Sequence, residues 1–171
     1  AARPLAQAVP VEWEAALGEA VVETLLSGER ECRTPAGIAA LDRLVGRLQA
    51  AGGQGYPFQV RVIADDMVNA FAAPGGQIVL LGGLLREAQS PEVLAAVLAH
   101  EMAHVIERHP TQAIIRRTGY RIALASLVGD LSGALALIAE SGELLLNLAH
   151  SRNDEAAADR YAIRLLQAAG L

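Results

Sequence analysis

The sequence of 171 residues has a single cysteine, no lysine and few aromatic residues, which make up 4% of the chain. One cysteine, Cys32, cannot form a disulfide within the chain, so a disulfide scaffold and a zinc site built from cysteines are excluded. All fourteen basic residues are arginine, they form no block, and the net charge is −5. A chain without a basic patch has no electrostatic footprint for a phosphate backbone, and we expect no nucleic-acid partner.

An initiating methionine is also missing, and the first ten residues show neither the basic start nor the apolar region of a signal peptide. We therefore expect a processed form or an excised piece of a longer chain. Hydrophobic residues make up 53% of the sequence, which at this length is enough for the core of one domain. We expect a single domain over residues 1–171.

The spacing of the apolar residues predicts several helices and one small sheet. Residues 10–50 carry two amphipathic helical patterns, the second opened by Thr34 as N-cap and Pro35 at the first helical position. Residues 58–81 change to short apolar or alternating runs separated by Gly and Pro, which is typical of three short strands joined by tight turns. We expect an antiparallel sheet here and a mostly helical α+β domain overall.

The segment “SPEVLAAVLAHEMAHVIERHP” predicts a helix within residues 90–109, with Ser90 as N-cap and Pro91 at the first helical position. His100 and His104 are four residues apart, so both imidazoles project from one face and can reach one metal ion. Glu101 follows the first histidine, where its carboxylate can act as a base. A short motif can occur by chance, but these three side chains would be costly to bury on an apolar helix without a partner such as a metal.

A further helix is predicted within residues 142–169, and it places Glu155 and Asp159 four residues apart on one face. Glu155 can complete a set of two histidines and one glutamate with an open position for water, the arrangement of a catalytic zinc site. Asp159 can accept the second N–H of a ligating histidine and fix its tautomer. The alternative is an exposed acidic pair beside Arg152 and Arg160.

Three motifs in this order, “NAFAAPGGQIVLLGGLL”, “HEMAHVIERH” and “SRNDEAAAD”, together resemble the peptidase family forty-eight metallopeptidases, a group of gluzincins. They cover about half the chain, from residue 69 to residue 161. The resemblance implies a zincin-type domain whose sheet lies next to the active-site helix. It also implies one Zn²⁺ per chain, with the ligands His100, His104 and Glu155 and the catalytic base Glu101.

The same resemblance implies that Asp159 supports a ligand and that a peptide substrate lies along the strand around Asn69, Ala70 and Phe71. Core packing is the alternative for Phe71. The family often has a polar or acidic residue where this chain has Ala157, which we expect to alter the surroundings of the metal more than the metal itself.

The resemblance identifies no residue that stabilises the oxyanion, and the candidates by proximity to Glu155 are His150, Arg152 and Tyr161. His109 also matches a family position. Because it lies five residues beyond His104, at the expected helix end, we interpret it as a cap or packing residue.

The activity implied is that of a zinc-dependent endopeptidase acting on polypeptide substrates, in particular unfolded or misassembled proteins of a bacterial cell envelope. The location implied is the periplasm or a membrane surface facing it, in association with the membrane or with envelope proteins. The alternative is a latent or non-proteolytic zinc-binding domain that works by binding partners. Glu101 favours the peptidase, because a structural zinc site needs no base. The specific substrate and the oligomeric state stay open.

Residues 122–139 form an apolar stretch close to the length of a membrane span. Asp130 lies in its middle, flanked by Gly129 and Gly133, which argues against a span. We expect a helical hairpin packed beside the active site, and a membrane-facing apolar surface is the alternative.

Overall fold

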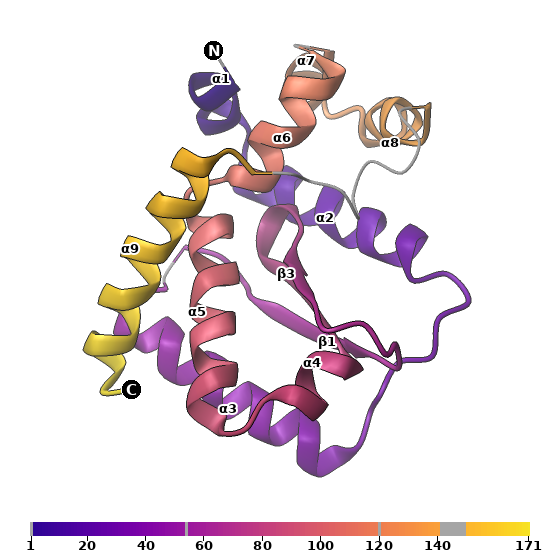
Figure 1. Cartoon of the computed structure of the whole chain (residues 1–171). Helices are drawn as coiled ribbons and strands as arrows, with labels where there is room; N and C mark the ends of the chain where they lie inside the picture. Colours follow the sequence, from indigo (N-terminus) through magenta and orange to yellow (C-terminus); the bar gives the residue numbers. More distant parts are fainter. Residues whose placement is uncertain (1, 54, 120, 141–149) are drawn as a thin grey trace.

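The computed structural model describes the chain except for residues 1, 54, 120 and 141–149, and Figure 1 shows helices arranged around a small sheet. This arrangement confirms the mostly helical α+β class. The elements are, in chain order, α1 (Ala2–Ala8), α2 (Val11–Leu25), α3 (Pro35–Ala51), β1 (Gln59–Ile63), β2 (Ala70–Ala72), the 3₁₀ turn η1 (Pro74–Gly76), β3 (Gln77–Leu81), α4 (Gly82–Glu87), α5 (Pro91–Ile106), α6 (His109–Thr118), α7 (Arg121–Val128), α8 (Leu131–Glu140) and α9 (Arg152–Ala169).

The sheet has three strands in the order β1-β3-β2 and is mixed. Strands β2 and β3 pair antiparallel, as expected. The antiparallel prediction is wrong for β1, which runs parallel to β3 with Gln59 opposite Gln77. The reason is the order of the strands. Because β3 is buried at all five positions, it takes the central place between β1 and the short β2. The chain reverses between β1 and β2 and again between β2 and β3, so β1 and β3 run in the same direction.

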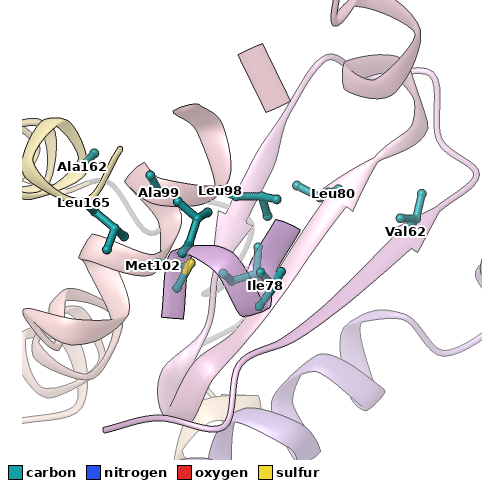
Figure 2. Packing of buried hydrophobic residues seen from close by; sticks show 10 residues of the cluster. Val62, Ile78, Leu80, Leu98, Ala99, Met102, Ala162 and Leu165 are labelled. Carbon is teal, nitrogen blue, oxygen red and sulfur yellow. The ribbon is translucent and has the colours of Figure 1, made fainter. Parts of the chain in front are cut away.

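The two faces of the sheet are covered by different helices. Strand β3 directs Ile78 and Leu80 to one face and Val79 to the other, as the alternation of a strand requires. Helices α3 and α5 pack on the first face, with α9 behind them, and α2 packs on the second (Figure 1). Figure 2 shows the first cluster from close by, where side chains of the sheet and of α5 and α9 meet, among them Val62, Ile78, Leu80, Leu98, Ala99, Met102, Ala162 and Leu165.

Helices α5 and α9 pack side by side, far apart in sequence but adjacent in space (Figure 1). Ala99 of α5 and Ala162 of α9 belong to the same buried cluster, in which Met102 and Leu165 fill the remaining volume (Figure 2). Small side chains at a contact allow two helix axes to approach closely. The packing therefore fixes the distance and the orientation of α9 relative to α5.

Helices α3 and α5 start at the expected N-cap residues, but these residues do not make the expected capping hydrogen bonds. Thr34 and Ser90 are the N-cap residues of α3 and α5, yet neither side chain accepts a hydrogen bond from a helix amide. The first part of the helix expected within residues 142–169 lies outside the described residues, and α9 begins at Arg152.

The apolar stretch forms two short helices, α7 and α8, separated at Gly129 and Asp130. Gly129 has φ of 72°, and Asp130 Oδ1 accepts a hydrogen bond of 2.8 Å from the Gly133 amide, so the break is built into the sequence. The hairpin packs on α1, α2 and α6, and it leaves Leu124, Leu127 and Val128 exposed. In the described part of the chain, none of the helices has the length and apolar character needed to cross a bilayer.

Candidate metal centre

Helix α5 places two imidazoles on the side that faces α9. His100 and His104 lie on successive turns, and their Nε2 atoms are 2.9 Å apart. His104 is buried, with 2% of its surface exposed, whereas His100 is partly accessible.

Helix α9 brings a carboxylate to the same point. It begins with a capping box, in which the Ser151 hydroxyl accepts from the Asp154 amide and the Asp154 carboxylate accepts from the Ser151 amide. This fixes the first turn and turns Glu155 toward α5. The two carboxylate oxygens of Glu155 lie 3.3 Å from His100 Nε2 and 3.6 Å from His104 Nε2. One atom from each of these three residues lies within 4.8 Å of the others.

The second nitrogen of each imidazole faces away from this point. His100 Nδ1 lies 3.0 Å from Asp159 Oδ1, and because an ionised carboxylate only accepts, Nδ1 carries the proton. His104 Nδ1 lies 3.0 Å from His109 Nδ1. Burial, together with the neighbouring imidazoles, lowers the pKa of His104 to about 2, so its ring is neutral near pH 7.

This arrangement fits a divalent metal. With Nδ1 as the protonated nitrogen of each ring, both Nε2 atoms direct lone pairs to one point, where the Glu155 carboxylate adds negative charge. The two lone pairs and the carboxylate oxygens repel one another unless a cation lies between them. Two imidazole nitrogens and a carboxylate are a common donor set for catalytic zinc.

Glu101 lies beside the cluster. Burial raises the pKa of Glu101 to about 7, with the His100 charge lowering it, the Glu155 carboxylate raising it and a hydrogen bond from the Ala72 amide lowering it. Its carboxylate therefore interacts both with the candidate ligands and with strand β2.

Residues 37–171 match the family model described as Peptidase family M48. The matched range covers most of the chain and includes all three candidate ligands. The chain belongs to peptidase family M48.

Relatives of this M48 chain carry protease names. The putative beta-barrel assembly-enhancing protease of Vibrio cholerae is 33% identical, over 94% of this chain and 35% of that protein. The mitochondrial metalloendopeptidase OMA1 of Schizosaccharomyces pombe is 35% identical, over 75% of this chain and 39% of that protein. The metalloprotease LoiP of Escherichia coli is 33% identical, over 91% of this chain and 66% of that protein. The M48 chain thus spans little more than a third of the length of the first two relatives.

In the part of the chain that the structure describes, the edge of β2 away from β3 pairs with no other strand, and this free edge faces α5 and Glu101. The Leu81 amide donates to the Asn69 carbonyl and the Ala73 amide to the Gln77 carbonyl, so the odd-numbered residues of this segment bond to β3. By the alternation of an antiparallel ladder, the backbone groups of Ala70 and Ala72 point to the other edge. There the Ala70 amide donates to Asn69 Oδ1, at 2.9 Å, and the Ala72 amide to Glu101. The side chain of Phe71 packs against the cluster on the opposite face of the sheet.

The three candidates for an oxyanion donor lie in different places. His150 stacks on His104, with ring centroids 4.1 Å apart and planes at 26°. The hydroxyl of Tyr161 donates to the Gly52 carbonyl at 2.9 Å, at the end of α3. Arg152 is exposed at the first residue of α9. The structure therefore brings only His150 of these three to the histidine cluster.

His109, expected to be a cap or packing residue, is packed against the ligand candidate His104. It is buried, with 4% of its surface exposed, and its ring meets that of His104 edge-on with centroids 5.0 Å apart. On a continuous helix, residues five apart would point to different faces. The left-handed conformation of Arg108, with φ of 57°, separates α5 from α6 and turns His109 back toward His104. The available signal is the Pro110 that follows, which suits the start of a new helix.

Proposed function

We propose that this chain is a zinc-dependent endopeptidase. One zinc ion per chain is held by His100, His104 and Glu155, and polypeptides are the substrate. The observation that carries the proposal is the meeting of these three ligand atoms within 4.8 Å, with the Glu101 carboxylate beside them. Membership of a peptidase family and the names of the relatives support it.

Zinc in such a site supplies a Lewis acid and a water molecule of lowered pKa. Glu101 accepts a proton from the attacking water and then donates it to the leaving amine nitrogen. Asp159 holds His100 in the tautomer that directs Nε2 to the metal, through the contact of 3.0 Å to Nδ1. His150 remains the candidate for a donor to the oxyanion.

The substrate lies along the free edge of β2 as an extended strand. Main-chain hydrogen bonds to Ala70 and to the Ala72 carbonyl hold it, which is a way of binding that tolerates many sequences. A substrate carbonyl replaces Asn69 Oδ1 at the Ala70 amide. Because Glu101 contacts Ala72, a strand bound at this edge passes next to the base. Phe71 supports the strand from the core face.

The substrates we propose are unfolded or misassembled proteins of a bacterial envelope, and the place of action is the periplasm or the adjoining membrane surface. The name of the relatives from Vibrio cholerae and Escherichia coli, beta-barrel assembly-enhancing protease, supports this assignment. Cell fractionation followed by detection of the protein tests the location. Recovery in the cytoplasmic fraction alone would contradict it.

The substitution Glu101→Gln tests the reaction. It keeps the size and polarity of the side chain and removes its capacity to accept a proton. We expect zinc content to equal that of the wild type and casein hydrolysis to fall by at least about 10²-fold, the usual contribution of a general base. Glu107→Gln is the matched control, since Glu107 lies just beyond α5 and pairs with Arg3 at the surface.

Casein hydrolysis by Glu101→Gln at a rate close to that of the wild type would refute the role of the base. A wild-type chain that binds zinc and cleaves no unfolded protein would instead support the latent or non-proteolytic alternative.

A further inference from the structure

We propose that His109 is a positioning residue for the zinc ligand His104, and that Asp154 holds His109 in place. The proposal rests on the proposed zinc site. Asp159 supports the ligand His100 with a carboxylate. His109 would support the second ligand, His104, with an imidazole.

The hydrogen-bond roles follow from the position of the metal ligand atom. His104 directs Nε2 to Glu155 and His100, so Nδ1 is the nitrogen that carries its proton. His109 Nδ1, at 3.0 Å, is then the acceptor. A neutral His109 that accepts at Nδ1 carries its own proton on Nε2, which lies 3.6 Å from Asp154 Oδ1. The contact between the two Nδ1 atoms therefore defines one tautomer for each ring, and the Asp154 charge, just beyond hydrogen-bond distance, favours the proton on His109 Nε2.

The backbone conformation at Arg108 places His109 behind the ligand His104. Arg108 adopts the left-handed conformation, which costs free energy for a residue other than glycine. Its guanidinium compensates by donating two hydrogen bonds of 2.6 Å, to the carbonyls of Ala6 and Val9. The turn that aims His109 at His104 is therefore fastened to the first helix of the chain and to the residue just beyond it.

Asp154 connects this contact to the third ligand. Its side chain accepts from the Ser151 amide at 3.0 Å and so forms part of the capping box that starts α9. The same carboxylate faces His109 Nε2, and the next residue in the chain is Glu155. The side chain of Asp154 thus contacts both His109 and the first turn of α9, which carries Glu155.

An imidazole suits this position because of burial. His104 has 2% of its surface exposed and His109 has 4%, whereas Asp159, which supports the other ligand, is exposed. A charged carboxylate directly behind His104 would carry a large desolvation cost. A neutral imidazole offers the same acceptor without a buried charge, and it places the carboxylate one ring farther out, at the partly exposed Asp154.

Two substitutions separate hydrogen bonding from packing. His109→Leu fills the space without an acceptor, and in His109→Asn the amide oxygen Oδ1 stands near the place of the lost Nδ1. Gln112→Leu is the matched control, because it removes a buried polar side chain of α6 whose hydrogen bond goes to the Glu107 carbonyl and not to a ligand. The zinc dissociation constant is measured by competition with a chelator, and the ligand field by the visible absorption of the Co²⁺-substituted protein.

We expect His109→Leu to weaken zinc binding by about 10- to 100-fold and to change the Co²⁺ spectrum, as loss of a partner behind a ligating histidine does. His109→Asn should bind zinc more tightly than His109→Leu, and Gln112→Leu should match the wild type. If His109→Leu does not fold, Asp154→Asn tests the same contacts. It keeps an oxygen for the cap, removes the charge facing His109, and should also weaken zinc binding.

Wild-type affinity and an unchanged Co²⁺ spectrum in His109→Leu would overturn the proposal while leaving the peptidase assignment in place. Equal weakening in His109→Asn and His109→Leu would show that the ring acts by packing alone, which also overturns it. A wild-type chain that binds no zinc would refute both this proposal and the proposed function.

Discussion

The Nε2 atoms of His100 and His104 lie 2.9 Å apart, although each belongs to a ring whose other nitrogen is occupied by a separate partner. Asp159 contacts Nδ1 of His100, and His109 contacts Nδ1 of His104. Both rings are therefore oriented before a metal binds. A site preorganised in this way loses little conformational freedom on binding a metal. The geometry leads to four predictions, two about the metal and two about the frame that holds it.

Glu155→Ala should remove most of the bound zinc. The two histidines that remain would share the metal with water, and α9 would no longer be connected to α5 through it. Metal content after gel filtration measures the loss, with Glu87→Ala on the exposed end of α4 as a control expected to keep its zinc. A Glu155→Ala protein with unchanged zinc would eliminate Glu155 as the third ligand.

Removal of zinc should lower the melting temperature. The proposed ligands come from two helices that are far apart in sequence, so a metal that binds only the folded chain stabilises it. At a free zinc concentration of about 100 times the dissociation constant, the stabilisation is about 2.7 kcal/mol. Melting with and without a chelator measures it, and Glu155→Ala should show a much smaller difference. A melting temperature that does not respond to chelation in the wild type would count against a metal bridging the two helices.

Gly18→Ala should destabilise the protein because α2 packs on the turn η1 without any space between them. A Cβ atom at Gly18 would lie 1.8 Å from the Pro74 carbonyl oxygen, so the helix or the turn would have to move. We expect a loss of about 1–3 kcal/mol or more in the free energy of unfolding. The matched control is Gly46→Ala on the exposed side of α3, where no described atom outside the helix's own backbone lies within 4 Å of the new Cβ. This control should gain about 0.5–1 kcal/mol, and two effects of the same sign would contradict the packing argument.

The buried Glu14 should make stability depend on pH. It is 1% exposed and accepts hydrogen bonds from Thr111 and Tyr56, with Arg108 Nε 3.7 Å away, yet burial raises its pKa above the ordinary value of 4.5. Between 4.5 and the raised pKa, the folded state retains a proton that the unfolded chain has released. The free energy of unfolding contributed by this group therefore falls as the pH rises through that window.

Glu14→Gln cannot titrate and lacks this contribution. The difference in unfolding free energy, wild type minus variant, should therefore decrease as the pH rises from 4.5. Urea unfolding of both proteins over a series of pH values measures it. A difference that is constant or increases with pH would show that burial does not raise the pKa of Glu14.

The parts of the site that follow from local periodicity could be predicted from the sequence. Four-residue spacing on a helix is enough to place His100 beside His104 and Glu155 beside Asp159, because these relations depend only on helix geometry. By packing α5 against α9, the structure brings Glu155 to both histidines and Asp159 to His100.

The parts that depend on non-local pairing or on one unusual backbone conformation could not be predicted. The parallel pairing of β1 with β3 depends on which strand is buried on both faces, and alternation within each strand does not determine that order. The contact of His109 with His104 depends on the left-handed turn at Arg108, which no periodic pattern contains. Tyr161 was close to Glu155 in sequence, but its position on α9 directs the hydroxyl to Gly52.

The direct packing of α5 on α9 has a consequence for how this chain can be altered. The three ligand atoms come from these two helices, and their separation is fixed by side chains such as Ala99 and Ala162. Helices α7 and α8 pack on α1, α2 and α6, away from the contact between α5 and α9. The exposed turn between α7 and α8, at Gly129 and Asp130, can therefore be lengthened or host an inserted sensor module without disturbing the metal geometry, which makes it the natural place to engineer external control of the site.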